Sequence, residues 1–125
     1  MAIIGLGTDI VEIARIEETV SRQPRFVQRI LTHAEQAQYE HHAEPVRYLA
    51  KRFAAKEAAA KALQTGIGRG VSWQHMHVDN DENGAPYLTF SQGALSVFEE
   101  KKARSCYLSI SDEKHYAVAT VIIEG

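Results

Sequence analysis

The segment Lys51–Ala62 carries the residue types in this sequence that are best suited to phosphate chemistry. In a helix, Phe53, Glu57 and Lys61 lie on one face because they recur at steps of four residues. A carboxylate beside an ammonium group, among alanines that keep the helix surface low, can hold a metal ion and a phosphate together. The same Glu–Lys spacing also occurs in ordinary exposed helix pairs, which contribute only ~0.2–0.5 kcal/mol. This segment alone leaves both interpretations open.

Asp9 is a second candidate ligand, in a segment, Ile3–Ile13, whose β-branched residues predict a strand. In a regular strand, Asp9 shares a face with Gly5 and Gly7, which carry no side chain. Glycines in a strand often mark the close approach of a ligand or of another backbone, and a bulge is the alternative. Asp9 and Glu57 would supply the carboxylates of a Mg²⁺ site only if this strand packs on the helix.

Three other groups of residues give weaker signals. The loop Gly66–Gly70 can cradle a phosphate through its backbone N–H groups, but it follows a helix, whereas a P-loop precedes one. His75 and His77 share a face of a predicted strand, yet zinc needs further ligands and no cysteine lies nearby. Cys106 has no activating neighbour in sequence, which favours a structural role over a nucleophilic one.

Arginines are concentrated in the first helical region, where they can dock an acidic helix or form an ordinary solvated face beside Glu17 and Glu18. The four are Arg15, Arg22, Arg25 and Arg29. Between Arg15 and Arg69 the sequence has 10 Lys/Arg against 6 Asp/Glu, whereas the remainder has 4 against 10. A basic segment in a mildly acidic chain points to a phosphate-rich ligand or an acidic protein partner. The sequence has no long run of basic residues, so it does not indicate nucleic-acid binding.

The elements that must position these groups follow from apolar periodicity and from turn residues. The first half predicts a helix over Ala14–Val20 and a second one from about Pro24. A third is predicted to run from a Thr32 cap to Tyr39, with Glu35 completing a capping box. The longest is predicted over Val46–Gln64 and is ended by Gly66. The alanines of the long helix allow close packing. The second half predicts strands Val71–Val78 and Tyr87–Phe90, a helix from a Ser91 cap to about Lys102, and a hairpin of Tyr107–Ile110 with Tyr116–Ile123.

Length and composition set the frame for this α+β arrangement. A chain of 125 residues, 45% hydrophobic and 24% charged, is expected to form a single domain over residues 1–125. One cysteine excludes an internal disulfide and suits a reducing compartment. The apolar stretch Ile3–Val11 is broken by Asp9 and has no basic leader, so we expect neither a signal peptide nor a membrane span. A cytoplasmic protein is expected.

Two motifs together resemble a known family. Gly5-Leu6-Gly7-Thr8-Asp9-Ile10-Val11, followed by Arg52-Phe53-Ala54-Ala55-Lys56-Glu57-Ala58-Ala59-Ala60-Lys61-Ala62, is similar to the small, holo-[acyl-carrier-protein] synthase type of 4'-phosphopantetheinyl transferase. Gly66-Ile67-Gly68, Asn83-Gly84-Ala85-Pro86 and the Ser109–Ala117 segment add to the likeness. The resemblance implies the family fold: one compact α+β domain with an antiparallel sheet packed against a long alanine-rich helix.

The resemblance also implies an activity. It is the Mg²⁺-dependent transfer of 4'-phosphopantetheine from coenzyme A to a serine hydroxyl of apo-acyl carrier protein, with release of adenosine 3',5'-bisphosphate, in the fatty acid biosynthesis branch of lipid metabolism. By the family pattern, Asp9 and Glu57 are the catalytic metal ligands, and Glu57 or a metal-associated water takes the serine proton. The coenzyme A contacts implied are Lys61, Arg52, Gly66, Ile67, Asn83 and Pro86.

The resemblance further implies a homotrimer with sites between adjacent protomers and a basic docking surface for the carrier protein made by Arg15, Arg22 and Arg25. One departure concerns Asp112, which stands where many members have a histidine; His115 lies three residues later. Ala85 replaces a basic residue that is common in its turn. Two other functions remain open on the residues alone: a metal-dependent nucleotide phosphohydrolase and a non-catalytic carrier-protein binding module.

Overall fold

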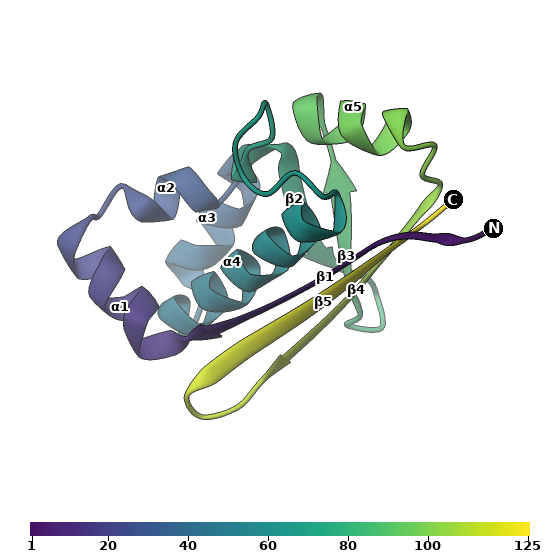
Figure 1. The fold of residues 1–125 in the computed structure, drawn as a ribbon. Coiled ribbons are helices and arrows are strands. Elements are labelled where there is room, and N and C mark those ends of the chain that lie inside the picture. The colour runs from purple at the N-terminus through teal and green to yellow at the C-terminus, as the bar shows by residue number, and fades with distance from the viewer.

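A central helix lies between a three-stranded sheet and a group of shorter helices in the computed structural model, which describes residues 1–125 (Figure 1). The elements, in chain order, are β1 (Ile3–Glu12), α1 (Ile13–Arg22), α2 (Phe26–Ile30), α3 (His33–His41), α4 (Pro45–Ala62), the 3₁₀ helix η1 (Trp73–His75), β2 (Met76–Asn80), β3 (Pro86–Phe90), α5 (Gln92–Glu100), β4 (Ser105–Asp112) and β5 (Tyr116–Glu124). None of the helices has the length and apolar character needed to span a bilayer.

The three-stranded sheet has the order β1-β5-β4, and every pair of neighbouring strands is antiparallel. Alternate residues of β5 point toward α4, and these four are fully buried: Ala117, Ala119, Val121 and Ile123. The predicted hairpin is therefore confirmed, with both strands longer than expected. The packing of an antiparallel sheet on the alanine-rich helix is confirmed as well.

Gly5 and Gly7 lie directly against α4. A Cβ atom at Gly5 would collide with the carbonyl group of Ala62, and one at Gly7 would collide with the carbonyl oxygen of Ala58. The absent side chains thus admit the backbone of a helix, which was one of the two uses expected for them. On the helix side, all six alanines from Ala54 to Ala62 are buried, because only small residues permit this approach.

A second core joins α4 to the helices before it. Ile30, Leu31, Leu49 and Ala50 are fully buried there, and Ile16 anchors α1 to the same cluster. The predicted capping box at the start of α3 is confirmed: the Thr32 hydroxyl accepts the N–H of Glu35, and the Glu35 carboxylate accepts the N–H of Thr32. This cap fixes where Glu35 enters the interior.

Three local predictions were wrong. The strand predicted over Val71–Val78 begins only at Met76, because Ser72 caps the 3₁₀ turn η1 and its own N–H is donated to His75 Nδ1. β2 and β3 form a separate two-stranded antiparallel sheet. The long helix ends at Ala62 instead of Gln64, and the Ser91 side chain makes no capping hydrogen bond to α5.

Candidate active site

The packing of β1 on α4 brings Asp9 to the middle of the helix. Gly5 lies against Ala62 and Gly7 against Ala58, so a step of two residues along the strand matches one helical turn. These distances agree, since two strand residues span about 6.6 Å and four helical residues about 6 Å. By the same step, Asp9, two residues further along the same face, is expected to lie opposite the turn of α4 that begins at Ala54 and includes Glu57.

The contacts of Asp9 confirm that it faces the helix. Its Oδ1 atom accepts a hydrogen bond from Lys61 Nζ at 3.1 Å, and the same ammonium group donates to the carbonyl oxygen of Thr8 at 2.9 Å. The Asp9 side chain is 16% exposed and that of Lys61 is 53% exposed. The pair lies at an accessible surface, where an incoming phosphate can replace the carboxylate as the partner of Lys61.

Glu57 lies one helical turn before Lys61 and is half-buried. Its Oε2 atom accepts the indole N–H of Trp73 at 2.9 Å. Its Oε1 atom and the Oδ2 atom of Asp9 accept no hydrogen bond within the chain. Each carboxylate thus retains a free, hard oxygen. No cluster of three or more His, Cys, Asp and Glu residues is assembled. Two carboxylates suit Mg²⁺, which usually takes one or two and completes its coordination with waters and substrate phosphates.

A pocket of about 550 Å³ lies at the other side of α4 and is lined mainly by polar and charged residues. Its cations, Arg47, Lys51 and Arg52, come from the first half of α4. The other residues are Gln38, His42, Glu44, Tyr48, Asp79, Asn80, Gly84, Pro86, Ile110 and Asp112. Arg52 and Pro86 were predicted as ligand contacts. Asn83 was predicted as well, but it lies at the tip of the β2–β3 turn, and Asn80 and Gly84 line the pocket in its place.

Arg52 is the buried cation of this pocket, and part of its hydrogen-bonding capacity is unused. It is only 6% exposed, its guanidinium stacks over the Tyr48 ring at 4.6 Å, and one terminal nitrogen donates to Asn80 Oδ1 at 3.2 Å. Its buried Nε atom has no partner. An unpaired buried donor is costly, so a ligand acceptor in the pocket would relieve that cost. Burial raises the pKa of Tyr48, although Arg52 opposes the shift, so the phenol stays protonated and donates to Gln38.

Asp112 occupies the rim of the pocket between two cations. Its carboxylate accepts from Arg47 at 3.0 Å and lies 3.4 Å from Lys51 Nζ. Desolvation alone would raise the pKa of Asp112, but the Arg47 hydrogen bond and the Lys51 charge outweigh it and hold that pKa below its usual value. Arg47 also donates to the carbonyl oxygens of Glu113 and Lys114, which ties the β4–β5 turn to the start of α4.

The predicted site residues therefore fall into two groups on one helix. Arg52 and Glu57 are five residues apart, so their side chains leave the helix axis roughly 140° from each other. Asp9, Glu57 and Lys61 form one group, and the loop with Gly66 and Ile67 follows the helix end near them. The pocket around Arg52 forms the other group. A single protomer does not gather both around one compact ligand.

The predicted docking arginines lie on the exposed surface of α1 and of the turn after it. Arg15 and Arg22 are seven residues apart and share one face, and Arg25 precedes α2. Arg22 pairs with Glu18 at 3.7 Å, whereas Arg15 and Arg25 have no acidic partner within salt-bridge distance. The surface keeps free positive charge for a partner.

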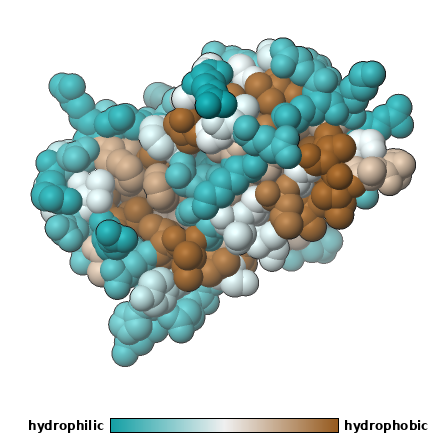
Figure 2. Space-filling view, in the orientation of Figure 1, coloured by the Kyte–Doolittle hydropathy of each residue, from teal (hydrophilic) through white to brown (hydrophobic).

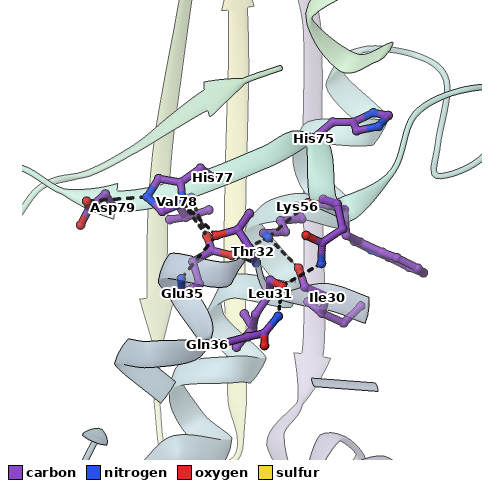
Figure 3. A network of polar contacts seen from close by, with 12 residues as sticks. Ile30, Leu31, Thr32, Glu35, Gln36, Lys56, His75, His77, Val78 and Asp79 are labelled. Atoms are coloured by element: carbon purple, nitrogen blue, oxygen red, sulfur yellow. Dashed lines mark hydrogen bonds and ion pairs between the residues drawn. The ribbon is translucent and has the colours of Figure 1, made fainter. Parts of the chain in front are cut away.

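Sequence reasoning missed a buried network beneath the site (Figure 3). Lys56 Nζ donates to Glu35 Oε1 and to the carbonyl oxygen of Ile30, both at 2.6 Å, and both charged side chains are fully buried. The second Glu35 oxygen accepts the N–H of Val78 at 2.7 Å, and His77 lies 3.7 Å from it. Burial lowers the pKa of Lys56, and the charge of Glu35 opposes that shift. Only the capping-box pattern could have drawn attention to Glu35.

The weaker candidates are structural. His75 belongs to η1 and His77 to β2, so they do not share a strand face as predicted. Burial raises the pKa of Cys106 to about 12, which leaves almost no thiolate at neutral pH. Cys106 is therefore a packing residue of β4, in line with the interpretation from sequence.

Comparison with known sequences identifies one family. A family model described as the 4'-phosphopantetheinyl transferase superfamily matches residues 5–121. Holo-[acyl-carrier-protein] synthase from Shewanella frigidimarina is 61% identical over the full length of both chains. The protein of the same name from Shewanella baltica strain OS185 is 62% identical over all of this chain and 99% of its own.

Solved structures agree with the sequence comparison. The crystal structure of holo-[acyl-carrier-protein] synthase from Neisseria meningitidis matches with a TM-score of 0.93 and 40% identity over 98% of this chain and 99% of that chain. The Bacillus anthracis enzyme in complex with CoA (3',5'-ADP) matches with a TM-score of 0.83 and 38% identity over 99% and 98%. The motifs, the fold and the full-length identity lead to one conclusion: the chain belongs to the 4'-phosphopantetheinyl transferase superfamily.

Proposed function

We propose that this protein transfers the 4'-phosphopantetheine group of coenzyme A to a serine hydroxyl of apo-acyl carrier protein and releases adenosine 3',5'-bisphosphate. The observation that carries the proposal is full-length identity of 61% or more to two relatives named for this reaction. Residues 1–125 would form one transferase domain. The rival assignments, a nucleotide phosphohydrolase and a binding module, lack such support.

Asp9 and Glu57 would hold Mg²⁺ through their free oxygens. When bound, the ion supplies positive charge that polarises the diphosphate of coenzyme A and neutralises the developing charge on the leaving group. Lys61 adds a fixed cation at the same surface, because its ammonium group is already oriented by Asp9 and by the Thr8 carbonyl. Such preorganised charge is effective in phosphoryl transfer, which depends mainly on positioning and electrostatics. Glu57 is the group we assign to accept the serine proton, directly or through water.

The pocket around Arg52 would hold the nucleotide end of coenzyme A. Its three cations suit phosphate groups, and Arg52 Nε provides a buried donor that no protein acceptor uses. Pro86 and the Tyr48 ring give the pocket apolar surfaces that suit a base. The glycine loop with Gly66 and Ile67 would lie along the pantetheine arm beside Lys61.

We propose a homotrimer whose sites lie between adjacent protomers. The outer face of the β1-β5-β4 sheet is uncovered and carries exposed apolar side chains, with Leu6 and Ile10 each 64% exposed and Tyr107 55% exposed. Figure 2 shows hydrophobic patches near the two ends of β1, with less hydrophobic residues between them. Such a face on a small protein marks a protein–protein contact. Association would also allow Asp9, Glu57 and Lys61 of one protomer to lie beside the Arg52 pocket of another protomer. A single chain does not bring these two sets of residues together.

The remaining parts of the proposal concern partner and setting. An acidic carrier protein would dock on the surface of Arg15, Arg22 and Arg25, where opposite charge speeds association at low salt. A reaction that loads acyl carrier protein belongs to fatty acid biosynthesis and thus to lipid metabolism. We propose a cytoplasmic location, where coenzyme A and reduced cysteine are both found.

Mass spectrometry of apo-acyl carrier protein incubated with the enzyme, coenzyme A and Mg²⁺ tests the proposal. We expect the carrier to gain the mass of phosphopantetheine at a serine, while adenosine 3',5'-bisphosphate accumulates in equal amount. Breakdown of coenzyme A with an unmodified carrier would instead indicate hydrolysis, and no reaction at all would leave a binding module. Asp9→Ala and Glu57→Ala should each abolish modification without loss of fold; normal rates in either would remove the metal-site assignment.

A further inference from the structure

Trp73 is the only tryptophan of the chain, and its indole group touches the candidate metal site. Its Nε1 atom donates to Glu57 Oε2 at 2.9 Å across a separation of 16 residues. An indole N–H can donate but cannot accept, so this contact suits an ionised carboxylate. Because the bond occupies Oε2, the free oxygen of Glu57 is Oε1.

Trp73 is itself held in place from three directions. Its ring lies beside that of Phe53, with the ring centroids 6.4 Å apart and the planes tilted by 34°. Its carbonyl oxygen accepts a hydrogen bond from Lys56 Nζ at 3.2 Å. Trp73 is also the first residue of η1, and Ser72 caps that turn.

The contact to Lys56 connects Trp73 with the buried network. Lys56 is fixed by the fully buried Glu35 and by the carbonyl oxygen of Ile30 (Figure 3). A continuous series of hydrogen bonds therefore runs from Glu35 through Lys56 to the backbone of Trp73, and from its indole to Glu57. Within this series, the buried Lys56 ammonium group donates to three acceptors, Ile30, Glu35 and Trp73, and so holds the Trp73 backbone rigidly.

We propose that Trp73 is a positioning residue for the divalent cation: its indole N–H orients the Glu57 carboxylate so that Oε1 faces the ion and Asp9. This inference rests on the proposed function, since it takes Asp9 and Glu57 as the metal ligands. Hydrogen bonds that orient a ligating side chain typically change metal affinity 10- to 100-fold. Trp73 touches neither coenzyme A nor the carrier in this assignment and acts through Glu57.

The test is the variant Trp73→Phe, which keeps an aromatic ring and removes the N–H donor together with part of the indole ring. We expect the affinity for Mn²⁺, measured by water proton relaxation in the presence of coenzyme A, to fall about 10- to 100-fold. The unfolding temperature should stay near that of the parent protein. Phe53→Leu is the matched control, because it changes the packing beside Trp73 and leaves the N–H in place; it should bind Mn²⁺ normally. Unchanged affinity in Trp73→Phe, or equal losses in both variants, would overturn the inference.

A second set of measurements, on the parent protein and on variants of Glu57 and Asp9, separates this inference from the proposed function. Mg²⁺ added with coenzyme A should change the emission of Trp73, and Glu57→Gln should remove that change. If Asp9→Ala weakens Mn²⁺ binding while Trp73→Phe does not, the metal site stands and only the role of Trp73 falls. If Asp9→Ala also binds Mn²⁺ like the parent, the metal-site assignment and this inference both fall.

Discussion

Helix α4 carries two lysine–carboxylate pairs of the same chemistry in opposite surroundings. Lys56 and Glu35 meet at 2.6 Å with neither side chain exposed, whereas Lys61 and Asp9 meet at 3.1 Å with side chains 53% and 16% exposed. The two lysines are only five residues apart on α4, and this spacing points them in different directions. Lys56 points toward the shorter helices, whereas Lys61 points toward the open edge of β1. Burial, more than residue type, divides their roles.

The difference determines what each pair can contribute. Removing one partner of a buried pair leaves a charge without water or counter-ion and typically costs 3–5 kcal/mol. An exposed pair contributes about 0–1 kcal/mol because solvent screens it. Lys56 is therefore expected to stabilise the fold, whereas Lys61 is free to exchange its partner for a ligand.

The largest effect on stability is expected from Lys56→Met. This change keeps a straight apolar chain without the ammonium group and leaves Glu35 buried with only N–H partners, so the free energy of unfolding should fall by about 3–5 kcal/mol. Urea denaturation measures the change. The double variant Glu35→Gln/Lys56→Met removes both charges and should recover a large part of the loss. A single variant as stable as the parent would show that the pair is not structural.

Lys61→Met should show the reverse pattern. The free energy of unfolding is expected to change by less than about 1 kcal/mol, because the pair is exposed. The turnover rate should fall by roughly 10²-fold or more, as is typical when one fixed donor to a developing charge is lost. Steady-state kinetics and denaturation on the same sample provide both numbers. Normal turnover would place Lys61 among ordinary surface residues.

Arg15 and Arg25 of the docking surface extend the comparison to cations that have no acidic partner. The double change Arg15→Glu/Arg25→Glu should raise KM for the carrier protein at least about 10-fold at low salt, because like charges would then face each other. KM for coenzyme A should stay near its normal value. Arg104→Glu, an exposed arginine before β4, is the matched control. Equal effects on both substrates would argue against a docking role.

The smallest effect on stability is expected at Asp112, which forms ion pairs with Arg47 and Lys51 and is partly exposed. Its pKa is lower in the folded state than the usual value near 3.9, so it adds stability above about pH 4 and loses that contribution as the pH falls through its folded pKa. Asp112→Asn should therefore flatten the acid side of the plot of unfolding temperature against pH. An identical acid slope in parent and variant would show that Arg47 and Lys51 do not stabilise the charged form.

Sequence patterns predicted those parts of the site that depend on local order. The 3.6-residue period gave the shared face of Glu57 and Lys61, and the capping box gave the start of α3. The glycines of β1 left a choice between a bulge and a close contact, and only the carbonyl groups of Ala58 and Ala62 decide it. That contact is non-local, since it joins residues more than fifty positions apart.

Other features could not be read from the sequence because they depend on how distant segments meet. Lys56 lies in the same motif as Glu57, yet its buried partner comes from another helix. The misplaced strand start at Val71 shows a second limit: alternating apolar residues favour extended chain, but Ser72 and His75 offer side-chain partners that stabilise a turn instead. The pairing of Asp112 with Arg47 and Lys51 likewise requires the hairpin to fold over α4.

The fit of Gly5 and Gly7 against α4 has a consequence for motion. Strand and helix meet backbone to backbone there, so neither can slide without the other, and their amides should exchange with deuterated solvent only slowly. The loop after α4 is built differently, with Gly66, Gly68 and Gly70 all at positive φ and no neighbouring atom close to their Cα hydrogens. Binding of a ligand to the site should therefore slow deuterium uptake in this loop. Uptake in β1 and α4 should change little, because it is already slow.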